Sequence, residues 1–302
     1  MENHRQGEKV KTLTVITTTY NRGYCLHQVY QSLCRQSSKD YIWMIIDDGS
    51  TDNTRELVQK WKSESAIEIE YYYKTNGGMH TARNVAYNLA GTELNMIVDS
   101  DDWLVDDAVE NIIDFWNKNK TEKAYGIIAY NVTKDGRIVG SSLPGEGIFS
   151  TLTELENRYH VKGDKKLILR SDLSKEYPFP EFPNEKFYPA SYKYRMLDLK
   201  YGLLIMKKAV CVVDYNEDSM TFSKYSQYKQ NPRGFAHFRN EMIRISKSPK
   251  VIFRENIHYI AESKFANDKN YISRSSKPFF TVLVLPIGLL YYSYLKRTNR
   301  QF

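Results

Sequence analysis

Strand-like and helix-like stretches alternate through the first hundred residues of this chain. Runs rich in β-branched and aromatic residues predict strands, and apolar residues at helical spacing between them predict helices. The predicted strands cover 13–19, 41–46, 67–73 and 96–98, and the predicted helices cover about 24–36, 54–63 and 80–90. This β-α-β-α-β-α-β series predicts an α/β fold with a doubly wound, mostly parallel sheet.

Two of these strands end in acidic turns. Asp47 and Asp48 follow the second strand, and Asp99, Asp101 and Asp102 follow the fourth. The carboxyl ends of parallel strands lie on one edge of the sheet, where open α/β sheets bind ligands. Crowded carboxylates at this edge favour a hard divalent cation, Mg²⁺ or Mn²⁺, which also binds substrate phosphates. The alternative is an acidic N-terminus for the helix predicted over 108–116.

Charge is divided unevenly along the chain. Residues 1–150 hold 16 Lys and Arg against 21 Asp and Glu, whereas 151–302 hold 27 against 15. The basic half favours a polyanionic partner, and because no nucleic-acid-binding motif is present we expect an anionic membrane surface and no nucleic acid. The uncharged run 278–295, flanked by basic residues, predicts either an interfacial or re-entrant helix or a helix buried on the rest of the protein.

The cysteines and the N-terminus bear on the compartment. The three cysteines have no metal or disulfide spacing, which favours a reducing compartment. Residues 1–11 are polar and lack the apolar core of a signal peptide. We therefore expect a cytoplasmic protein that is peripheral on the inner face of the cell membrane.

Three motifs, in order and at the right spacing, resemble those of glycosyltransferase family 2. They read VITTTYNR at 15–22, IDDGSTD at 46–52 and DSDD at 99–102, and NGGMH at 76–80 matches a segment common in bacterial members. The resemblance covers roughly residues 12–130. It implies the GT-A fold and a nucleotide-diphosphate sugar as donor, with a UDP-sugar favoured.

The resemblance also implies roles for residues of the nucleotide-sugar site. Thr18 and Tyr20 would line the base pocket, and Arg22 belongs to the same motif. Asp48 would accept the imide N–H of a uracil-type base, and Arg83 would lie near the base or the diphosphate. The alternatives are that Asp48 only builds a turn and that Arg83 is a surface charge on a helix.

The family's Asp-x-Asp element corresponds to Asp99, Ser100 and Asp101. The resemblance implies that Asp99 or its neighbour contacts the ribose, while Asp101 or Asp102 binds the Mg²⁺ or Mn²⁺. The growing negative charge on a departing nucleoside diphosphate needs such a cation in the transition state.

The segment that would carry the catalytic base is less similar to the family. Within the proline-rich stretch 178–187, Glu185 is the residue expected to deprotonate the acceptor hydroxyl, with Glu181 as the main rival and Asp198 as a weaker one. Glu185 could instead be a solvent-exposed loop glutamate. Residues 215–220 resemble a following family segment to which no role is assigned.

We therefore expect a hexosyltransferase-type enzyme of bacterial surface-polysaccharide (capsule) synthesis, inverting, with a saccharide or lipid-linked acceptor. Its expected regions are a nucleotide-sugar-binding GT-A core over 1–130, an irregular acceptor-binding and catalytic-base region over 131–260, and C-terminal membrane-associating helices over 261–302. The competing hypotheses are a sugar-nucleotide nucleotidyltransferase and a non-catalytic, carbohydrate-binding GT-A-like domain.

Overall fold

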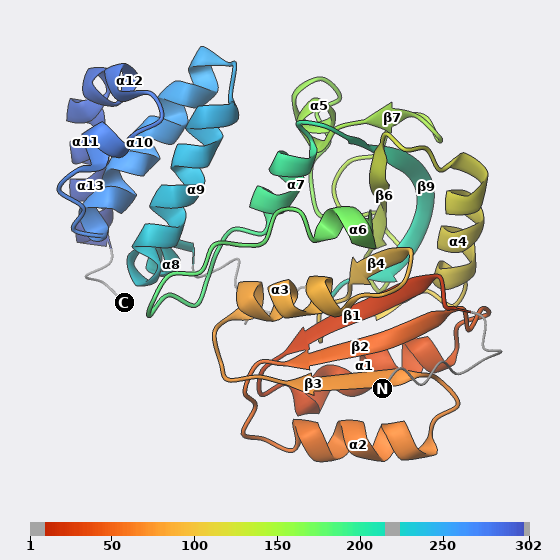
Figure 1. Ribbon diagram of the computed structural model, residues 1–302. Helices are drawn as coiled ribbons and strands as arrows, with labels where there is room; N and C mark the ends of the chain where they lie inside the picture. The colour runs from red at the N-terminus through yellow and green to blue at the C-terminus, as the bar shows by residue number, and fades with distance from the viewer. Residues whose placement is uncertain (1–9, 215–223, 299–302) are drawn as a thin grey trace, which may run out of the picture. The chain divides into compact units, whose positions relative to one another are not determined.

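The computed structural model describes residues 10–214 and 224–298, and these fall into two compact units (Figure 1). Unit 1 comprises the described residues up to Pro178 together with Lys193–Asp214. Unit 2 comprises Phe179–Tyr192 together with 224–298. The family-like segment 215–220 lies outside the described residues, and the expected division into three functional regions stays a prediction.

Unit 1 is built on one nine-stranded sheet with the order β3-β2-β1-β4-β8-β6-β9-β5, and β7 pairs with β9. Strands β1 to β4 pair in parallel, as the alternating pattern predicted, and β6 pairs in parallel with β9. The strands are β1 (Leu13–Thr19), β2 (Tyr41–Asp47), β3 (Ile69–Tyr73), β4 (Leu94–Ile97), β5 (Trp103–Leu104), β6 (Ala124–Val132), β7 (Phe149–Ser150), β8 (Lys165–Arg170) and β9 (Gly202–Val212).

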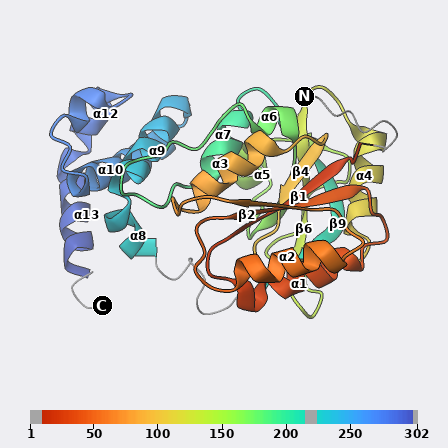
Figure 2. The same ribbon diagram turned by 60° about the horizontal axis from the view of Figure 1, so that its bottom comes forward.

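Helices cover both faces of the sheet in unit 1, as Figures 1 and 2 show. Leu26 of α1, Val58 of α2 and Ile112 of α4 share one apolar core with Val15 and Ile45 of the sheet. Helix α3 contacts β1 and β2 from the opposite face. The helices are α1 (Gly23–Cys34), α2 (Thr54–Glu64), α3 (Met79–Leu89), α4 (Ala108–Asn119), α5 (Leu152–Asn157), α6 (Ser171–Ser174) and α7 (Ser191–Leu197). The α/β class and the double winding are thus confirmed.

Strand β8 is among the elements that the sequence did not predict, together with β5, β7 and β9. It lies inside the region 131–260 that was expected to be irregular, and it inserts between β4 and β6, antiparallel to both. The sheet is therefore mixed, although most of its paired residues belong to parallel ladders. Strand β8 matters for the site because it brings Lys166 next to the end of β4.

Unit 2 is helical. Its helices are α8 (Lys224–Gln230), α9 (Pro232–Ile245), α10 (Pro249–Phe265), α11 (Tyr271–Arg274), α12 (Pro278–Leu283) and α13 (Leu285–Thr298). A buried guanidinium joins α9 to α10, because Arg239 of α9 lies 2.9 Å from Glu255 and 3.3 Å from Glu262 of α10. Apolar side chains from α9 to α13 complete the packing.

The uncharged run 278–295 forms α12 and most of α13, with a break at Val284. Pro286 is the second residue of α13, where a missing backbone N–H costs little. In the described part of the chain, no helix has the length and apolar character needed to cross a membrane.

Candidate functional site

Three carboxylates follow β4 at the carboxyl edge of the parallel strands, and each faces a different basic side chain. The shortest nitrogen–oxygen distances are 3.1 Å for Arg83–Asp99, 2.7 Å for Arg22–Asp101 and 3.8 Å for Lys166–Asp102. The three cations come from α3, the β1–α1 turn and β8. The fold therefore gathers three acids and three bases from four segments at one point.

Arg83 is a buried member of the predicted nucleotide-binding set, as are Asp48 and Ser100. It is 8% exposed, and its Nη2 donates to Asp99. Its Nε is buried and has no hydrogen-bond partner among the described residues. Desolvation alone would raise the pKa of Asp99, but the charges of Arg83 and Lys166 lower it below its ordinary value. A buried guanidinium with an unused donor beside a half-exposed carboxylate fits an oxygen-rich ligand.

Asp101 is the more open of the two predicted metal ligands. Arg22 donates to its Oδ2, and the side chain stays 26% exposed. The turn that carries Arg22 is fixed because Asn21, in the left-handed region at φ 52°, accepts from the backbone N–H of Thr51 at 2.7 Å. This contact ties the β1–α1 turn to the β2–α2 turn at the same edge.

Asp102 is buried. Its Oδ1 accepts from the backbone N–H of Asp214, and its Oδ2 faces Lys166, whose ammonium also donates to the Ile97 carbonyl. Burial raises the pKa of Asp102 to about 7, against the lowering effect of Lys166. Sequence reasoning missed Lys166, and a lysine within the apolar pattern of β8 was the signal available.

Asp48 is also buried, and its carboxylate is fully occupied. Oδ1 accepts from Lys74 Nζ at 2.6 Å and from the Gly77 N–H at 3.0 Å. Oδ2 accepts from Asn76 Nδ2 at 3.2 Å and from the Gly78 N–H at 2.7 Å. A carboxylate has about four acceptor positions, so these contacts favour the role of building the turn. Imide binding by Asp48 stays a prediction.

The remaining predicted nucleotide-sugar residues lie on the same edge of unit 1. Thr18 is part of β1, near its end, and Tyr20 follows that strand with 48% of its surface exposed. Ser100 is buried between the two acids of the Asp-x-Asp element. Their contacts with a nucleotide stay predictions.

The carboxylate oxygens at the acidic edge suit a hard divalent cation that also binds substrate phosphates. Throughout 10–214 and 224–298, no three His, Cys, Asp or Glu side chains converge as a complete ligand set. Mg²⁺ and Mn²⁺ sites often use one or two carboxylates together with substrate phosphates. Asp101 fits that arrangement, because only one of its oxygens is engaged by Arg22.

Glu185, the expected base, belongs to unit 2. It is buried, and its carboxylate binds the start of α9: Oε1 accepts from Arg233 N and Nε, and Oε2 accepts from the Gly234 N–H at 2.7 Å. The alternative of a solvent-exposed loop glutamate is therefore wrong. Glu181 is exposed. Asp198 accepts from the Leu152 and Thr153 backbone at the start of α5 in unit 1.

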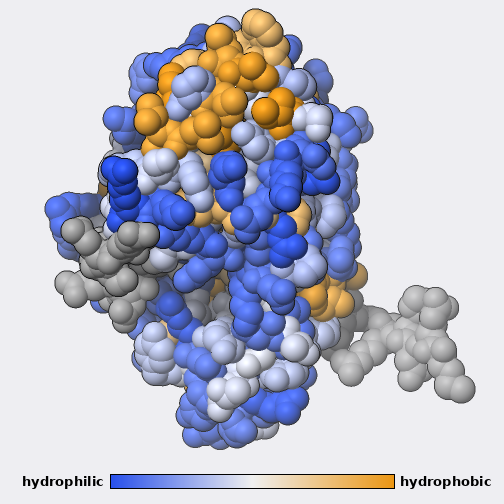
Figure 3. All heavy atoms as spheres, turned by 90° about the vertical axis from the view of Figure 1, so that its left-hand side faces the viewer, coloured by the Kyte–Doolittle hydropathy of each residue, from blue (hydrophilic) through white to orange (hydrophobic). Residues whose placement is uncertain are grey.

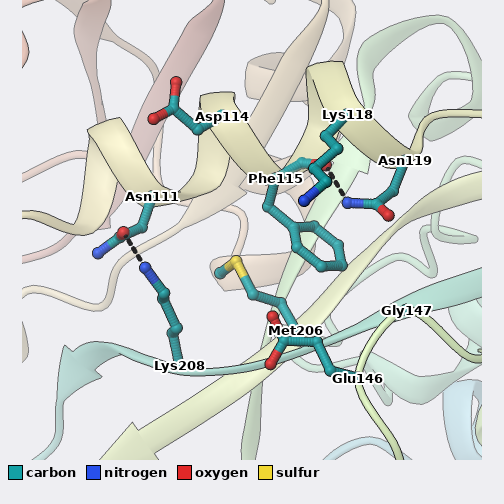
Figure 4. Close-up of a pocket in the computed structure, with 9 residues that line it drawn as sticks. All are labelled: Asn111, Asp114, Phe115, Lys118, Asn119, Glu146, Gly147, Met206 and Lys208. Carbon is teal, nitrogen blue, oxygen red and sulfur yellow. Dashed lines mark hydrogen bonds between the residues drawn. The ribbon is translucent and has the colours of Figure 1, made fainter.

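A cavity of about 300 Å³ lies elsewhere in unit 1, between α4, β9 and the loop at Gly147 (Figure 4). Lys208 and Asn111 are hydrogen-bonded at its rim, and Phe115 and Met206 line its floor. It contains none of the predicted site residues.

Known proteins show the same sequence pattern and fold. The sequence model described as Glycosyl transferase family 2 matches residues 14–175. Poly(ribitol-phosphate) beta-N-acetylglucosaminyltransferase TarP of Staphylococcus aureus (strain N315) is 28% identical over 171 residues, which make up 55% of this chain and 51% of TarP. The chain therefore spans about half the length of that relative.

Two solved structures share the GT-A fold with this chain. S. aureus TarS 1-349 in complex with UDP-GlcNAc has a TM-score of 0.60 and 20% identity, covering 91% of this chain and 79% of that one. The mannosyltransferase PcManGT from Pyrobaculum calidifontis in complex with GDP-Man and Mn²⁺ has a TM-score of 0.54 and 14% identity, covering 94% and 82%. Since the family pattern covers more than half of the sequence, the chain belongs to glycosyl transferase family 2.

Proposed function

We propose that this protein transfers a sugar from a nucleoside-diphosphate sugar to a saccharide acceptor. The observation that carries the proposal is the pairing of Arg22 with Asp101 and of Arg83 with Asp99 at the carboxyl edge of the sheet. These side chains offer charged donors and acceptors to a diphosphate and a ribose at the place where α/β folds bind nucleotides.

The donor would be held by unit 1. Arg83 keeps its Nε for a diphosphate or sugar oxygen, while its Nη2 holds Asp99 in position for a ribose hydroxyl. Arg22 would turn from Asp101 towards the diphosphate when the donor and cation bind. Tyr20, which is exposed and precedes Arg22 by two residues, would offer a ring face to the base.

Asp101 is the better candidate for holding Mg²⁺ or Mn²⁺. Asp102 already pairs with Lys166 and accepts from the backbone N–H of Asp214, whereas only one carboxylate oxygen of Asp101 is bound by Arg22. A divalent cation bound there would supply positive charge to the departing diphosphate. The Mn²⁺ in the PcManGT complex supports this proposal by similarity of fold.

We assign the removal of the acceptor proton to Glu185, with inversion at the anomeric carbon. Three donors occupy about three of the four acceptor positions of its carboxylate and leave one on Oε2. The start of α9 thus fixes the direction of the remaining lone pair, which is what a general base requires.

For the acceptor we propose a lipid-linked saccharide of a bacterial surface polysaccharide, such as a capsule. The name of TarP supports a polymeric acceptor, which is poly(ribitol-phosphate) in the case of that protein. A lipid-linked acceptor would place the protein peripherally at the cytoplasmic face of the membrane. The charge excess of the second half supports that location.

The first test is a screen of UDP- and GDP-sugars by thermal shift with Mn²⁺, followed by an assay of nucleoside-diphosphate release in membrane extract. A ligand of the native state raises the unfolding temperature. We expect one sugar nucleotide to stabilise the protein and to release its diphosphate only when acceptor is present. Pyrophosphate formation from a nucleoside triphosphate and a sugar phosphate would establish a nucleotidyltransferase instead. Stabilisation without turnover in any extract would establish a binding domain.

A further inference from the structure

Exposed apolar side chains concentrate at one place in unit 2. Of the nineteen large hydrophobic side chains that are exposed in the described residues, seven lie within 279–294. They are Phe279, Val282, Leu283, Ile287, Leu289, Leu290 and Tyr294, with exposures from 37% to 76%. We call this set the outer face. Figure 3 shows hydrophobic residues gathered at the top of the view, where α12 lies.

The outer face follows helix geometry. Phe279, Val282 and Leu283 are spaced i, i+3, i+4 on α12, and Ile287, Leu290 and Tyr294 are spaced i, i+3, i+7 on α13. Side chains at these spacings share one side of a helix. Each helix thus presents an apolar side outward.

The opposite sides of the same helices are already occupied by protein. Thr281 is fully buried, with hydrogen bonds to Asn256 of α10 and to Ser275. Gly288 brings the α13 backbone against Ile260 of α10, where an added Cβ would meet side-chain carbons at 2.7–2.9 Å. The outer face therefore cannot be buried by rolling either helix onto α10 without breaking these contacts.

Positive charge accompanies the outer face. The segment 224–298 holds 14 Lys and Arg against 4 Asp and Glu. Lys277 directly precedes α12, and the exposed Lys296 and Arg297 end α13. Hydrophilic residues lie beside and below the patch in Figure 3. An apolar surface bordered by cations complements anionic lipid headgroups over acyl chains.

We propose that the outer face docks on an anionic lipid bilayer, with α12 and α13 lying in the plane of the interface. Because both helices are short, they suit the interface rather than a crossing. A second copy of the chain is a poorer occupant, since it would bring the same positive segment against this one. This proposal specifies the surface for the membrane association proposed above and does not require that the transfer reaction is correctly assigned.

The test is co-sedimentation of the full chain with vesicles of phosphatidylcholine alone and of roughly 7:3 phosphatidylcholine and phosphatidylglycerol, without sugar nucleotide or acceptor. We expect binding to the anionic vesicles at least about tenfold tighter than to the neutral ones, and weaker binding at high salt. Equal binding to both, or to neither, would overturn the proposal. Sugar-nucleotide turnover, measured separately, does not enter this result.

Variants locate the contact. The triple substitution Phe279→Ser, Leu283→Ser and Leu290→Ser should lower vesicle affinity at least about tenfold, because it removes apolar area that enters the bilayer. Leu199→Ser, at an exposed position of unit 1, is the matched control and should bind like the wild type. If the triple variant binds as tightly as the wild type, the outer face is not the docking surface.

Charge and insertion are checked by two further variants. Lys296→Gln with Arg297→Gln should weaken anionic binding several-fold, whereas Lys60→Gln with Lys62→Gln, both exposed on α2, should not. Phe279→Trp preserves the bulk and should show a blue-shifted emission with anionic vesicles, unlike Leu199→Trp. The absence of that shift would contradict insertion. A dimer in solution that the triple variant dissociates would identify the outer face as a self-association surface.

Discussion

Asp48 shows how a side chain at the predicted nucleotide edge can serve the fold. Its four hydrogen bonds fasten the 74–78 segment that leads into α3, and one of them comes from the ammonium of Lys74. Gly49, at φ 90°, lies so close to Asn76 that an added Cβ would meet its backbone nitrogen at 2.8 Å. The turn and the carboxylate thus depend on each other.

We predict that Asp48→Asn lowers the free energy of unfolding by about 2 kcal/mol, because buried donors lose a charged acceptor. The free energy of unfolding is measured by denaturant titration with tryptophan fluorescence as the signal. All of the tryptophans belong to unit 1. Asp114→Asn, at an exposed position of α4, is the control and should change little. Unchanged stability with weaker nucleotide binding would instead favour the imide-binding role.

Glu185 and Glu181 are separated by comparing Glu185→Gln with Glu181→Gln. We expect Glu185→Gln to lose roughly 10²–10⁴ in kcat, since the amide cannot take a proton, with donor affinity nearly unchanged. Turnover and donor binding are measured separately, and hydrogen exchange of α9 reports whether its start stays folded. If only the Glu181 variant loses turnover, the base lies four residues earlier.

Two kinds of contact join the helices of unit 2. Arg239 is held between Glu255 and Glu262, and Gly288 lets α13 approach Ile260. The first contact is electrostatic and buried, so it responds to pH. The second is steric and responds to a single methyl group.

Burial raises the pKa of Glu262 from its ordinary 4.5 to about 7, against the lowering effect of Arg239. The folded state therefore binds more protons than the unfolded state between these values, and the wild type loses stability as pH rises through that window. Glu262→Gln resembles the protonated form and should gain unfolding temperature relative to the wild type as pH rises from about 5 to about 8. Calorimetry of both proteins at each pH tests this. A difference that is independent of pH would refute the assignment.

The substitution Gly288→Ala has two opposing effects on stability, one from helix propensity and one from packing against α10. Alanine favours a helix by about 1 kcal/mol over glycine, but overpacking against Ile260 costs about 1–3 kcal/mol. We expect faster hydrogen exchange in α10 and α13 of the variant. Ser293→Ala, on the exposed side of α13, should leave exchange unchanged or slower. Slower exchange in Gly288→Ala would mean that the helices do not pack this closely.

At the scale of the whole molecule, the elements that the sequence predicted correctly are those whose own residues carry a strand or helix pattern. β-branched runs and amphipathic spacing were enough for β1 to β4 and their helices, since each of these elements is specified within its own residues. Strand β8 was missed because its backbone pairs with β4 and β6, which are distant in sequence. It also lies among proline-rich and turn-rich segments, which do not predict a strand.

The same distinction holds for the candidate site. Asp99, Asp101, Arg22 and Arg83 could be named from the sequence, but the pairing of these acids with these bases could not. Lys166 was missed altogether, because it reaches Asp102 only through the fold. The contacts of Glu185 with α9 depend on residues 48 and 49 positions away in the sequence. Contacts between side chains that are so far apart in the sequence cannot be predicted from the pattern of neighbouring residues.

The most direct test of the central claim is calorimetric titration of UDP and of GDP into the wild type and Asp101→Asn, with Mn²⁺ and with excess chelator. We predict that the wild type binds one of the two nucleotides and that chelator or Asp101→Asn each weakens this binding at least roughly tenfold, because a carboxylate shares the cation with the diphosphate. Asp114→Asn should bind like the wild type. Equal affinity of Asp101→Asn and wild type, unaffected by chelator, would contradict the account.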